Sequence, residues 1–274
     1  MPRPDFLALP ARSAKPRRAG ITHVLDSGLP VSQTAALLEV GGAYIDVWKF
    51  GWGTAYIDPG LPDKLDLLAR NRVLACPGGT LLEIAWAQGR TAEFLDWAAA
   101  AAFPCVEVSA GAVTMTRADK DRLIAVAAER FIVLAEAGSK DPAARAGPGE
   151  WVRTVERDLA AGATWVLGEG RESGTVGLYD ASGAVRSDVV DALAAAGLVD
   201  SVVFEAPRKD QQAWFVRRFG SEVNLANVRP GEALGLETLR LGLRADTVGA
   251  ATPAAPTVRA FGPPSRAGDG PVTP

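Results

Sequence analysis

Seven short apolar segments of this sequence end in a charged or amide side chain. They include ITHVLD ending at Asp26, YIDVWK ending at Lys49 and SVVFE ending at Glu205. A charge at the end of a buried strand is costly in free energy unless it is paired or used. The repetition therefore predicts a ring of polar side chains at one rim of a closed sheet. The ring consists of Asp26, Lys49, Glu107, Glu136, Glu169 with Arg171, Glu205 and Asn227.

The predicted rim carries several carboxylates and several cations, which suits a divalent hard metal ion together with an anionic substrate. Mg²⁺ takes oxygen ligands, usually keeps some of its water and needs only one or two protein carboxylates. Lysine and arginine side chains would neutralise a phosphate, a carboxylate or another oxyanion. The candidates are Asp26, Glu107, Glu136, Glu169 and Glu205 as carboxylates, and Lys49, Lys140, Arg171 and Lys209 as cations.

The histidine and cysteine content limits the chemistry further. The single histidine, His23, lies inside the first apolar segment and has no Ser or Cys partner that would suggest a triad, so we interpret it as a core or supporting residue. Cys76 and Cys105 both fall inside predicted strands and are interpreted as small buried hydrophobes in a reducing compartment. A zinc site is not indicated. General acid–base chemistry therefore falls to lysine, glutamate or water.

The spacing of the segments predicts the fold. An eighth apolar segment, VLACPGGT, ends in glycines, and helix-like stretches separate the eight segments. One such stretch starts at Thr116, with Asp119 three residues on, and another has Val152, Val155 and Leu159 at helical spacing. A strand with its crossover helix needs about 30 residues. Eight such units predict a (β/α)₈ TIM barrel, whose active site lies at the carboxyl ends of the strands. An open doubly wound sheet is the alternative, but it would need two edges.

Composition bounds the class of protein. At 274 residues with 48% hydrophobic content, the chain can bury the core of one domain, and its net charge of −3 does not favour nucleic-acid binding. No apolar run reaches membrane-spanning length, so we expect a soluble cytoplasmic protein. We expect an N-terminal arm over residues 1–20, lying over the mouth or the bottom of a barrel formed by 21–247. Residues 248–274, rich in Pro, Gly and Ala, are expected to form a flexible, disordered tail.

Two glycine-containing segments leave alternatives open. The long stretch EGRESGTVGLYDASGAV, from Glu169 onward, has backbone amides that could surround a phosphate or sulfonate, and the shorter PGGT at 77–80 would let the backbone approach a ligand. Plain turns explain both segments equally well. Gln211 and Gln212 open a predicted helix, where an amide could hold phosphate or simply cap the helix.

Several of these stretches together resemble one family, the phosphosulfolactate synthases, which act in one route to coenzyme M and in bacterial sulfolactate formation. The matching stretches include YIDVWKFGWGT at 44–54, EGRESG at 169–174, VVFEAPRKDQQ at 202–212 and VNLANV at 223–228. The resemblance extends over roughly residues 10–247, in order and with family-like spacing. It implies a (β/α)₈ barrel and a Mg²⁺-dependent addition of sulfite to phosphoenolpyruvate, which gives (R)-2-phospho-3-sulfolactate.

The resemblance also implies roles for individual residues. Lys140 would be the general acid, and Lys49 and Arg171 would be catalytic cations that hold phosphate or sulfite. Further substrate contacts are expected from Lys209, Gln211 and Asn227, and metal contacts from Glu136, Glu169 and Glu205, with Asp26 and Glu107 behind them. Arg240, Arg244 and Asp246 form a family motif on the last helix and are interpreted as structural. The implied ligands are Mg²⁺ and small anions, with a homo-oligomer possible.

One departure from the family pattern keeps other functions open. The segment SAG at 109–111 places Ala110 where the family usually has Asp or Asn, so the pocket for the nucleophile could differ. A related barrel that adds another nucleophile to phosphoenolpyruvate is therefore an alternative. A non-catalytic relative associated with stress is the other.

Overall fold

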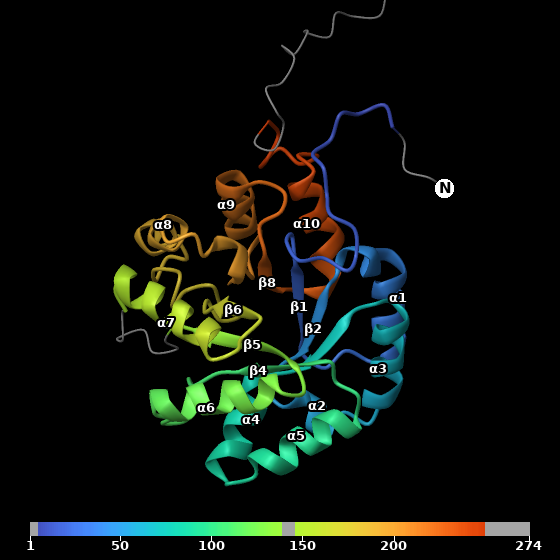
Figure 1. Cartoon of the computed structure of the whole chain (residues 1–274). Coiled ribbons are helices and arrows are strands. Elements are labelled where there is room, and N and C mark those ends of the chain that lie inside the picture. The colour runs from blue at the N-terminus through green and yellow to red at the C-terminus, as the bar shows by residue number, and fades with distance from the viewer. Residues whose placement is uncertain (1–4, 139–145, 250–274) are drawn as a thin grey trace, which may run out of the picture.

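The computed structural model describes residues 5–138 and 146–249. Eight parallel strands form one sheet in the order β3-β2-β1-β8-β7-β6-β5-β4, and it curls into a barrel (Figure 1). The predicted (β/α)₈ barrel is confirmed, and the open doubly wound sheet is wrong. The strands are β1 Thr22–Asp26, β2 Val47–Phe50, β3 Leu74–Pro77, β4 Cys105–Val108, β5 Ile132–Ala137, β6 Trp165–Gly168, β7 Val202–Glu205 and β8 Leu225–Val228.

Helices cover the outside of the barrel (Figure 1). The predicted start of α6 is confirmed, because the Thr116 hydroxyl accepts a hydrogen bond from the amide of Asp119. No helix of the described residues is long and apolar enough to cross a membrane. The helices are α1 Val31–Gly41, α2 Thr54–Ile57, α3 Leu61–Arg70, α4 Gly79–Ala87, α5 Thr91–Ala100, α6 Arg117–Ala128, α7 Pro148–Ala160, α8 Ser187–Ala195, α9 Lys209–Phe219 and α10 Ala233–Arg240, with 3₁₀ turns η1 Gly42–Tyr44, η2 Val199–Ser201 and η3 Pro230–Glu232.

The seam between β3 and β4 differs from the other strand neighbours. Backbone ladders join the other seven neighbouring pairs of the barrel. At the seam the Cys105 thiol donates to the carbonyl of Ala75 at 3.2 Å, so a side chain links the two strands. Cys105 and Cys76 are both buried thiols in the barrel interior, and burial raises the pKa of Cys76. Their interpretation as buried small residues agrees with this placement.

Side-chain alternation along the strands creates two separate cores. One core fills the barrel interior, and a larger one lies between the outer face of the strands and the helices. Because successive strand residues point to opposite faces, residues two apart share a face. Five charged residues each follow an interior apolar residue by two positions and therefore lie above it, inside the barrel at the carboxyl ends of the strands. The pairs are Val47–Lys49, Cys105–Glu107, Leu134–Glu136, Leu167–Glu169 and Val203–Glu205.

The N-terminal arm lies at the opposite end of the barrel. Arg12 pairs with Glu222, just before β8, at 2.6 Å, and with Glu237 of α10 at 3.0 Å. Arg17 pairs at 3.0 Å with Asp46, which precedes β2. Figure 1 shows the arm beside α10. Of the two placements left open by the sequence, the described part of the arm therefore occupies the bottom of the barrel. Most of the tail expected from residue 248 onward lies outside the described residues.

Arg240 of α10 closes the same end of the barrel from inside. Its fully buried guanidinium donates to the carbonyls of Ser221, Val223 and Ile21 at 2.7, 2.6 and 3.1 Å. Burial lowers the pKa of Arg240 to about 9, with Arg12 adding to the shift. These contacts support the structural role expected for Arg240, because they tie α10 to the entries of β1 and β8.

We expect Arg240→Met to lower the free energy of unfolding by about 3 kcal/mol, because it leaves three buried carbonyls without their charged donor. Urea unfolding would measure the loss. Arg244→Met is the matched control: its side chain is partly exposed and its ion pair with Asp246 spans 3.8 Å, so a change below about 0.5 kcal/mol is expected. Equal losses in both variants would contradict the structural role of Arg240.

Candidate active site

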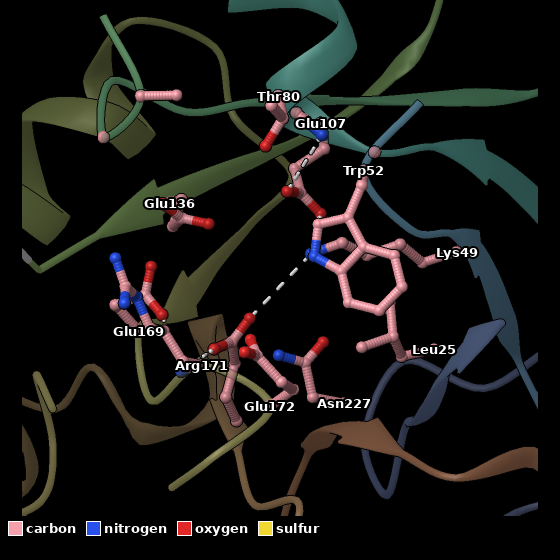
Figure 2. Close-up of a pocket in the computed structure, with 15 residues that line it drawn as sticks. Leu25, Lys49, Trp52, Thr80, Glu107, Glu136, Glu169, Arg171, Glu172 and Asn227 are labelled. Carbon is pink, nitrogen blue, oxygen red and sulfur yellow. Dashed lines mark hydrogen bonds and ion pairs between the residues drawn. The ribbon is translucent and has the colours of Figure 1, made fainter. Parts of the chain in front are cut away.

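A cavity of about 250 Å³ opens at the carboxyl ends of the strands (Figure 2). Five glutamates and two cations line it among the described residues, so carboxylates outnumber cations. The lining residues come from the carboxyl ends of the eight strands and the segments that follow them. They are Leu25, Lys49, Trp52, Gly78, Gly79, Thr80, Glu107, Gly111, Ala112, Glu136, Glu169, Arg171, Glu172, Glu205 and Asn227.

Lys49 is the buried positive charge of the cavity. Its ammonium lies 2.8 Å from a carboxylate oxygen of Glu107 and 3.9 Å from one of Glu205 (Figure 2). Burial alone would lower the pKa of Lys49, but Glu107, Glu205 and Glu136 outweigh that effect and raise it above its ordinary value. The ammonium therefore stays protonated at neutral pH. It is suited to stabilising negative charge and not to acting as a base.

Glu205 connects this charge to the loop after β6. Its second oxygen accepts hydrogen bonds from the amides of Gly170 and Arg171 at 2.8 and 2.9 Å. Burial raises the pKa of Glu205, and repulsion from Glu136 adds to the increase, while Lys49 opposes it. The Tyr179 hydroxyl also donates to the Glu205 carbonyl, so both the backbone and the side chain of Glu205 hold the loop.

Arg171 occupies the first turn of that loop in a left-handed conformation, with φ of 56°. Its amide donates to Glu169 at 2.6 Å as well as to Glu205, and these two bonds fix the turn. The side chain is exposed at the cavity, and no carboxylate of the described chain pairs with its guanidinium. Arg171 therefore presents a positive charge that an anionic ligand can bind.

Asn227 enters the cavity through an irregularity in β8. The register between β1 and β8 shifts by one residue before Val228, and Asn227 has φ of 54°. Such a bulge re-aims a side chain, and asparagine tolerates the left-handed region. His23, fully buried on β1, accepts the Asn227 amide at its Nδ1 at 3.3 Å and so supports the bulge. Burial and Lys49 lower the pKa of His23 to about 3, so the ring is neutral.

The glycines of the PGGT segment are required by close packing around Glu107. A Cβ added to Gly79 would lie 2.8 Å from a Glu107 oxygen and would also collide with Ser109. The Gly79 amide, at the start of α4, donates to that carboxylate at 3.1 Å. Gly78 is equally constrained, since its Cβ would lie 2.8 Å from the Phe50 carbonyl. The segment thus positions Glu107 as well as lining the cavity.

Asp26 belongs to the outer face of the barrel and not to the cavity. Its carboxylate accepts bonds from Trp48 at 3.1 Å and Gly28 at 2.8 Å, and it pairs with the buried ammonium of Lys64 at 3.4 Å. Asp26, one of the two weaker candidates for metal contact, therefore does not line the cavity with the other predicted carboxylates. Alternation explains this placement, because Leu25 is the residue of β1 that points inward to the cavity.

Two predicted substrate contacts also lie away from the cavity. The exposed ammonium of Lys209 pairs with Asp246 at 2.8 Å. Gln211 donates to the carbonyls of Gly174 and Gly183 at 2.9 and 3.1 Å and accepts the Arg208 amide, so it caps α9 and holds the loop after β6. The capping alternative for Gln211 agrees with these contacts. Lys140, the expected general acid, lies outside the described residues.

Three residues that shape the cavity had no role predicted from the sequence. Trp52 and Thr80 line it directly. Glu83 of α4, fully buried, accepts the amides of Ala112 and Val113 at 2.6 and 3.0 Å and thereby folds the loop after β4. Glu83 could have been recognised in the sequence as a charged residue inside the apolar helix GTLLEIAWA. Ala110, in the same loop, is exposed and is not among the lining residues.

The donor chemistry of the cavity fits a hard cation only in part. No three His, Cys, Asp or Glu side chains of the described ranges are grouped closely enough to hold a metal ion by themselves. The excess of carboxylates over cations nevertheless supplies the oxygen donors that Mg²⁺ prefers, and Mg²⁺ needs only one or two of them from protein. Glu136, Glu169 and Glu205 all line the cavity, and the oxygens of Glu205 face two amides and Lys49.

The fold, with its cavity at the carboxyl ends of the strands, is that of a single-barrel enzyme that acts on small substrates. The family model described as (2R)-phospho-3-sulfolactate synthase (ComA) matches residues 10–246. The chain belongs to this family. The phosphosulfolactate synthase of Methanothermobacter thermautotrophicus is 42% identical over 251 residues, 89% of this chain and 97% of the relative. That of Bacillus subtilis is 39% identical over 247 residues, 89% of this chain and 98% of the relative.

Solved structures with lower identity share the fold alone. A 3-hexulose-6-phosphate synthase superposes with a TM-score of 0.50 at 18% identity, covering 81% of this chain and 99% of the other. The YdjI aldolase from Escherichia coli K12 gives a TM-score of 0.52 at 14% identity, covering 77% and 76%. Both comparisons agree with the barrel architecture.

We expect Gly79→Ala to reduce the catalytic efficiency, kcat/KM, about a hundredfold, because the added Cβ displaces Glu107 from Lys49. The stability loss should be about 1–3 kcal/mol, as for other overpacked sites. Steady-state kinetics and urea unfolding would separate the two effects. Gly147→Ala is the control, since a Cβ there meets no atom within 4 Å. Full activity in Gly79→Ala would contradict the tight packing around Glu107.

We expect the His23 ring to stay neutral from pH 5 to pH 8, with the hydrogen on Nε2 because Nδ1 accepts a bond. NMR of the imidazole signals tests this in the untagged chain, which has one histidine. The unfolded ring titrates near the ordinary histidine pKa of 6.5, whereas the folded pKa is about 3. The unfolded state therefore binds more protons between these values, and this group lowers stability as the pH falls below about 6.5. Titration of the folded signal near 6.5 would contradict the prediction.

Proposed function

We propose that the chain catalyses the addition of sulfite to C3 of phosphoenolpyruvate, giving (R)-2-phospho-3-sulfolactate, a carbon–sulfur lyase reaction, in the cytoplasm and with Mg²⁺. Family membership supports the assignment. The observation that carries it is the Lys49 ammonium, held among carboxylates on the floor of a cavity that also exposes Arg171. A permanently charged ammonium inside a cavity of this kind suits the stabilisation of negative charge that develops on a bound anion.

The proposed reaction places a clear electrostatic demand on the cavity. The sulfur lone pair of sulfite forms a bond to C3, and the electrons of the C2–C3 double bond move into the carboxylate, which becomes an aci-carboxylate dianion. A proton delivered to C2 then completes the product. The raised pKa of Lys49 keeps its charge in place throughout, so Lys49 would stabilise the dianion. Arg171 would bind the phosphate or the sulfite.

Two anionic substrates must also enter a cavity whose described lining has more carboxylates than cations. A divalent cation bound by Glu136 and Glu169 would reduce this repulsion. Mg²⁺, when bound, supplies Lewis-acid stabilisation of developing negative charge. The repulsion between the cavity and its substrates is thus the argument from this chain for a metal ion.

The proton for C2 requires a group other than Lys49, whose pKa is raised and which is therefore a weak acid at neutral pH. We propose Lys140, on the sequence resemblance, as this general acid. Ala110 gives little support to another nucleophile, since its side chain lies outside the described cavity lining. The charged cavity also argues against a non-catalytic barrel.

We expect purified protein with phosphoenolpyruvate, sulfite and Mg²⁺ to form phosphosulfolactate, detected by ³¹P NMR and mass spectrometry. Lys49→Met should lower the rate by at least about a hundredfold, because the dianion loses its fixed counter-charge. Lys140→Ala should abolish product if Lys140 is the acid. Lys209→Met should keep activity, since its ammonium lies outside the cavity.

The outcomes of this assay are distinct. No product from folded wild-type protein with Mg²⁺ present would reject the proposed function. Product from Lys140→Ala at the wild-type rate would retain the function and reject Lys140 as the acid. Activity in Lys49→Met equal to wild type would reject the role of the buried ammonium. A chelator should remove activity, and added Mg²⁺ should restore it.

A further inference from the structure

Lys120 of α6 reaches the back of β5 directly behind a cavity residue. Its ammonium donates to the backbone carbonyl of Glu136 at 2.7 Å and pairs with Asp158 of α7 at 2.8 Å. Lys120 is 5% exposed and Asp158 is completely buried. A buried lysine and a buried aspartate are costly in free energy unless each satisfies the other. Here the pair also satisfies a strand-end carbonyl.

The position of this contact follows from the end of the β4–β5 ladder. The register between the two strands stops at the pair Val108–Ala135, one residue before Glu136. On the other side of β5, the carbonyl of Ala137 accepts a hydrogen bond from the amide of Glu169. Backbone groups of successive residues point to alternate neighbours, so the Glu136 carbonyl points to the side from which β4 has departed. Lys120 supplies the donor that a longer β4 would have supplied.

The charge of Lys120 makes this contact strong. Hydrogen bonds from an ionised donor are roughly twice as strong as neutral ones. Asp158 balances the ammonium and also pairs with Arg117 at 2.7 Å, so the three side chains form one cluster between α6 and α7. Within this cluster, Lys120 holds the end of β5 where the chain leaves the sheet.

We propose that Lys120, fixed by Asp158, is a positioning residue that aims the Glu136 carboxylate into the cavity. Glu136 is 7% exposed and lines the cavity, and its charge contributes to the electrostatic field on Lys49. The direction of the Glu136 side chain depends on the backbone conformation at the carboxyl end of β5. The effect of Lys120 on ligand binding thus passes through Glu136. This positioning role rests on the proposed function only in the choice of the ligand that is measured.

A double-mutant cycle between Lys120→Met and Glu136→Gln tests the proposal. The readouts are phosphoenolpyruvate affinity with Mg²⁺, by calorimetry, and kcat/KM. We expect Lys120→Met to weaken both about tenfold or more in the wild-type background and less than about twofold in the Glu136→Gln background, since coupled residues are not additive. Equal factors in the two backgrounds, or no effect in either, would overturn the proposal.

Two further variants separate positioning from general stability. Arg117→Met removes the other cation from Asp158 but leaves Lys120 on the Glu136 carbonyl, so it should lower the melting temperature without changing ligand affinity. Lys120→Arg keeps a charged donor and should restore most of the affinity. If Lys120→Met does not fold, Asp158→Asn serves as the weaker perturbation, with the same cycle.

A readout without any ligand keeps this test independent of the proposed function. Hydrogen–deuterium exchange of the peptide covering residues 132–138 should become faster in Lys120→Met and should stay unchanged in Arg117→Met. Unchanged exchange in Lys120→Met would overturn the positioning role even if the wild-type protein is active. Faster exchange together with an inactive wild type would support the positioning role and reject the proposed reaction.

Discussion

The structure depends on keeping one ammonium, that of Lys49, among carboxylates inside a barrel. A buried charge is tolerated only when partners surround it, and three glutamates without a cation would repel one another. The apolar layer beneath it in the barrel interior, which includes Val47 and Val203, excludes water from this cluster. Each principal partner has its own anchor: the Gly79 amide holds Glu107, and loop amides hold Glu205. The chemistry of the cavity and the shape of its loops are therefore consequences of one buried charge.

A second set of buried polar groups supports the site from outside the strands. Asp26 pairs with Lys64, and Lys120 pairs with Asp158, each linking helices to strand ends in the layer between sheet and helices. Glu83 serves the loop after β4 in the same way. Charges that point inward thus line the cavity, and those that point outward hold the backbone. The inward set lies at the ends of strands, and most of the outward set lies on helices, as Lys64, Lys120 and Asp158 do.

The barrel and most of the lining could be predicted from the sequence, because apolar runs at regular spacing determine where strands end. Alternation within each run would also have separated Asp26 from its inward neighbour Leu25. The end of its apolar run placed Asn227 at the rim, whereas alternation alone would have turned it outward, because a bulge in β8 overrides the alternation there. The role of Gln211 was ambiguous in the sequence, because a side-chain amide at the start of a helix can bind either a ligand or a backbone carbonyl of the protein. Glu83 acts through a loop 26 residues or more away in sequence, which no local pattern reveals.

The arm at the bottom of the barrel has a consequence for synthesis of the chain. Arg12 contacts Glu222 and Glu237, which lie 210 and 225 residues further along. These contacts cannot form until nearly the whole chain has left the ribosome, and β1 must likewise wait for β8. Long-range pairing of this kind is slow to form. During translation the edge of β1 that pairs with β8 therefore remains unprotected, and Arg12 finds its partner on α10 only after that helix has been made.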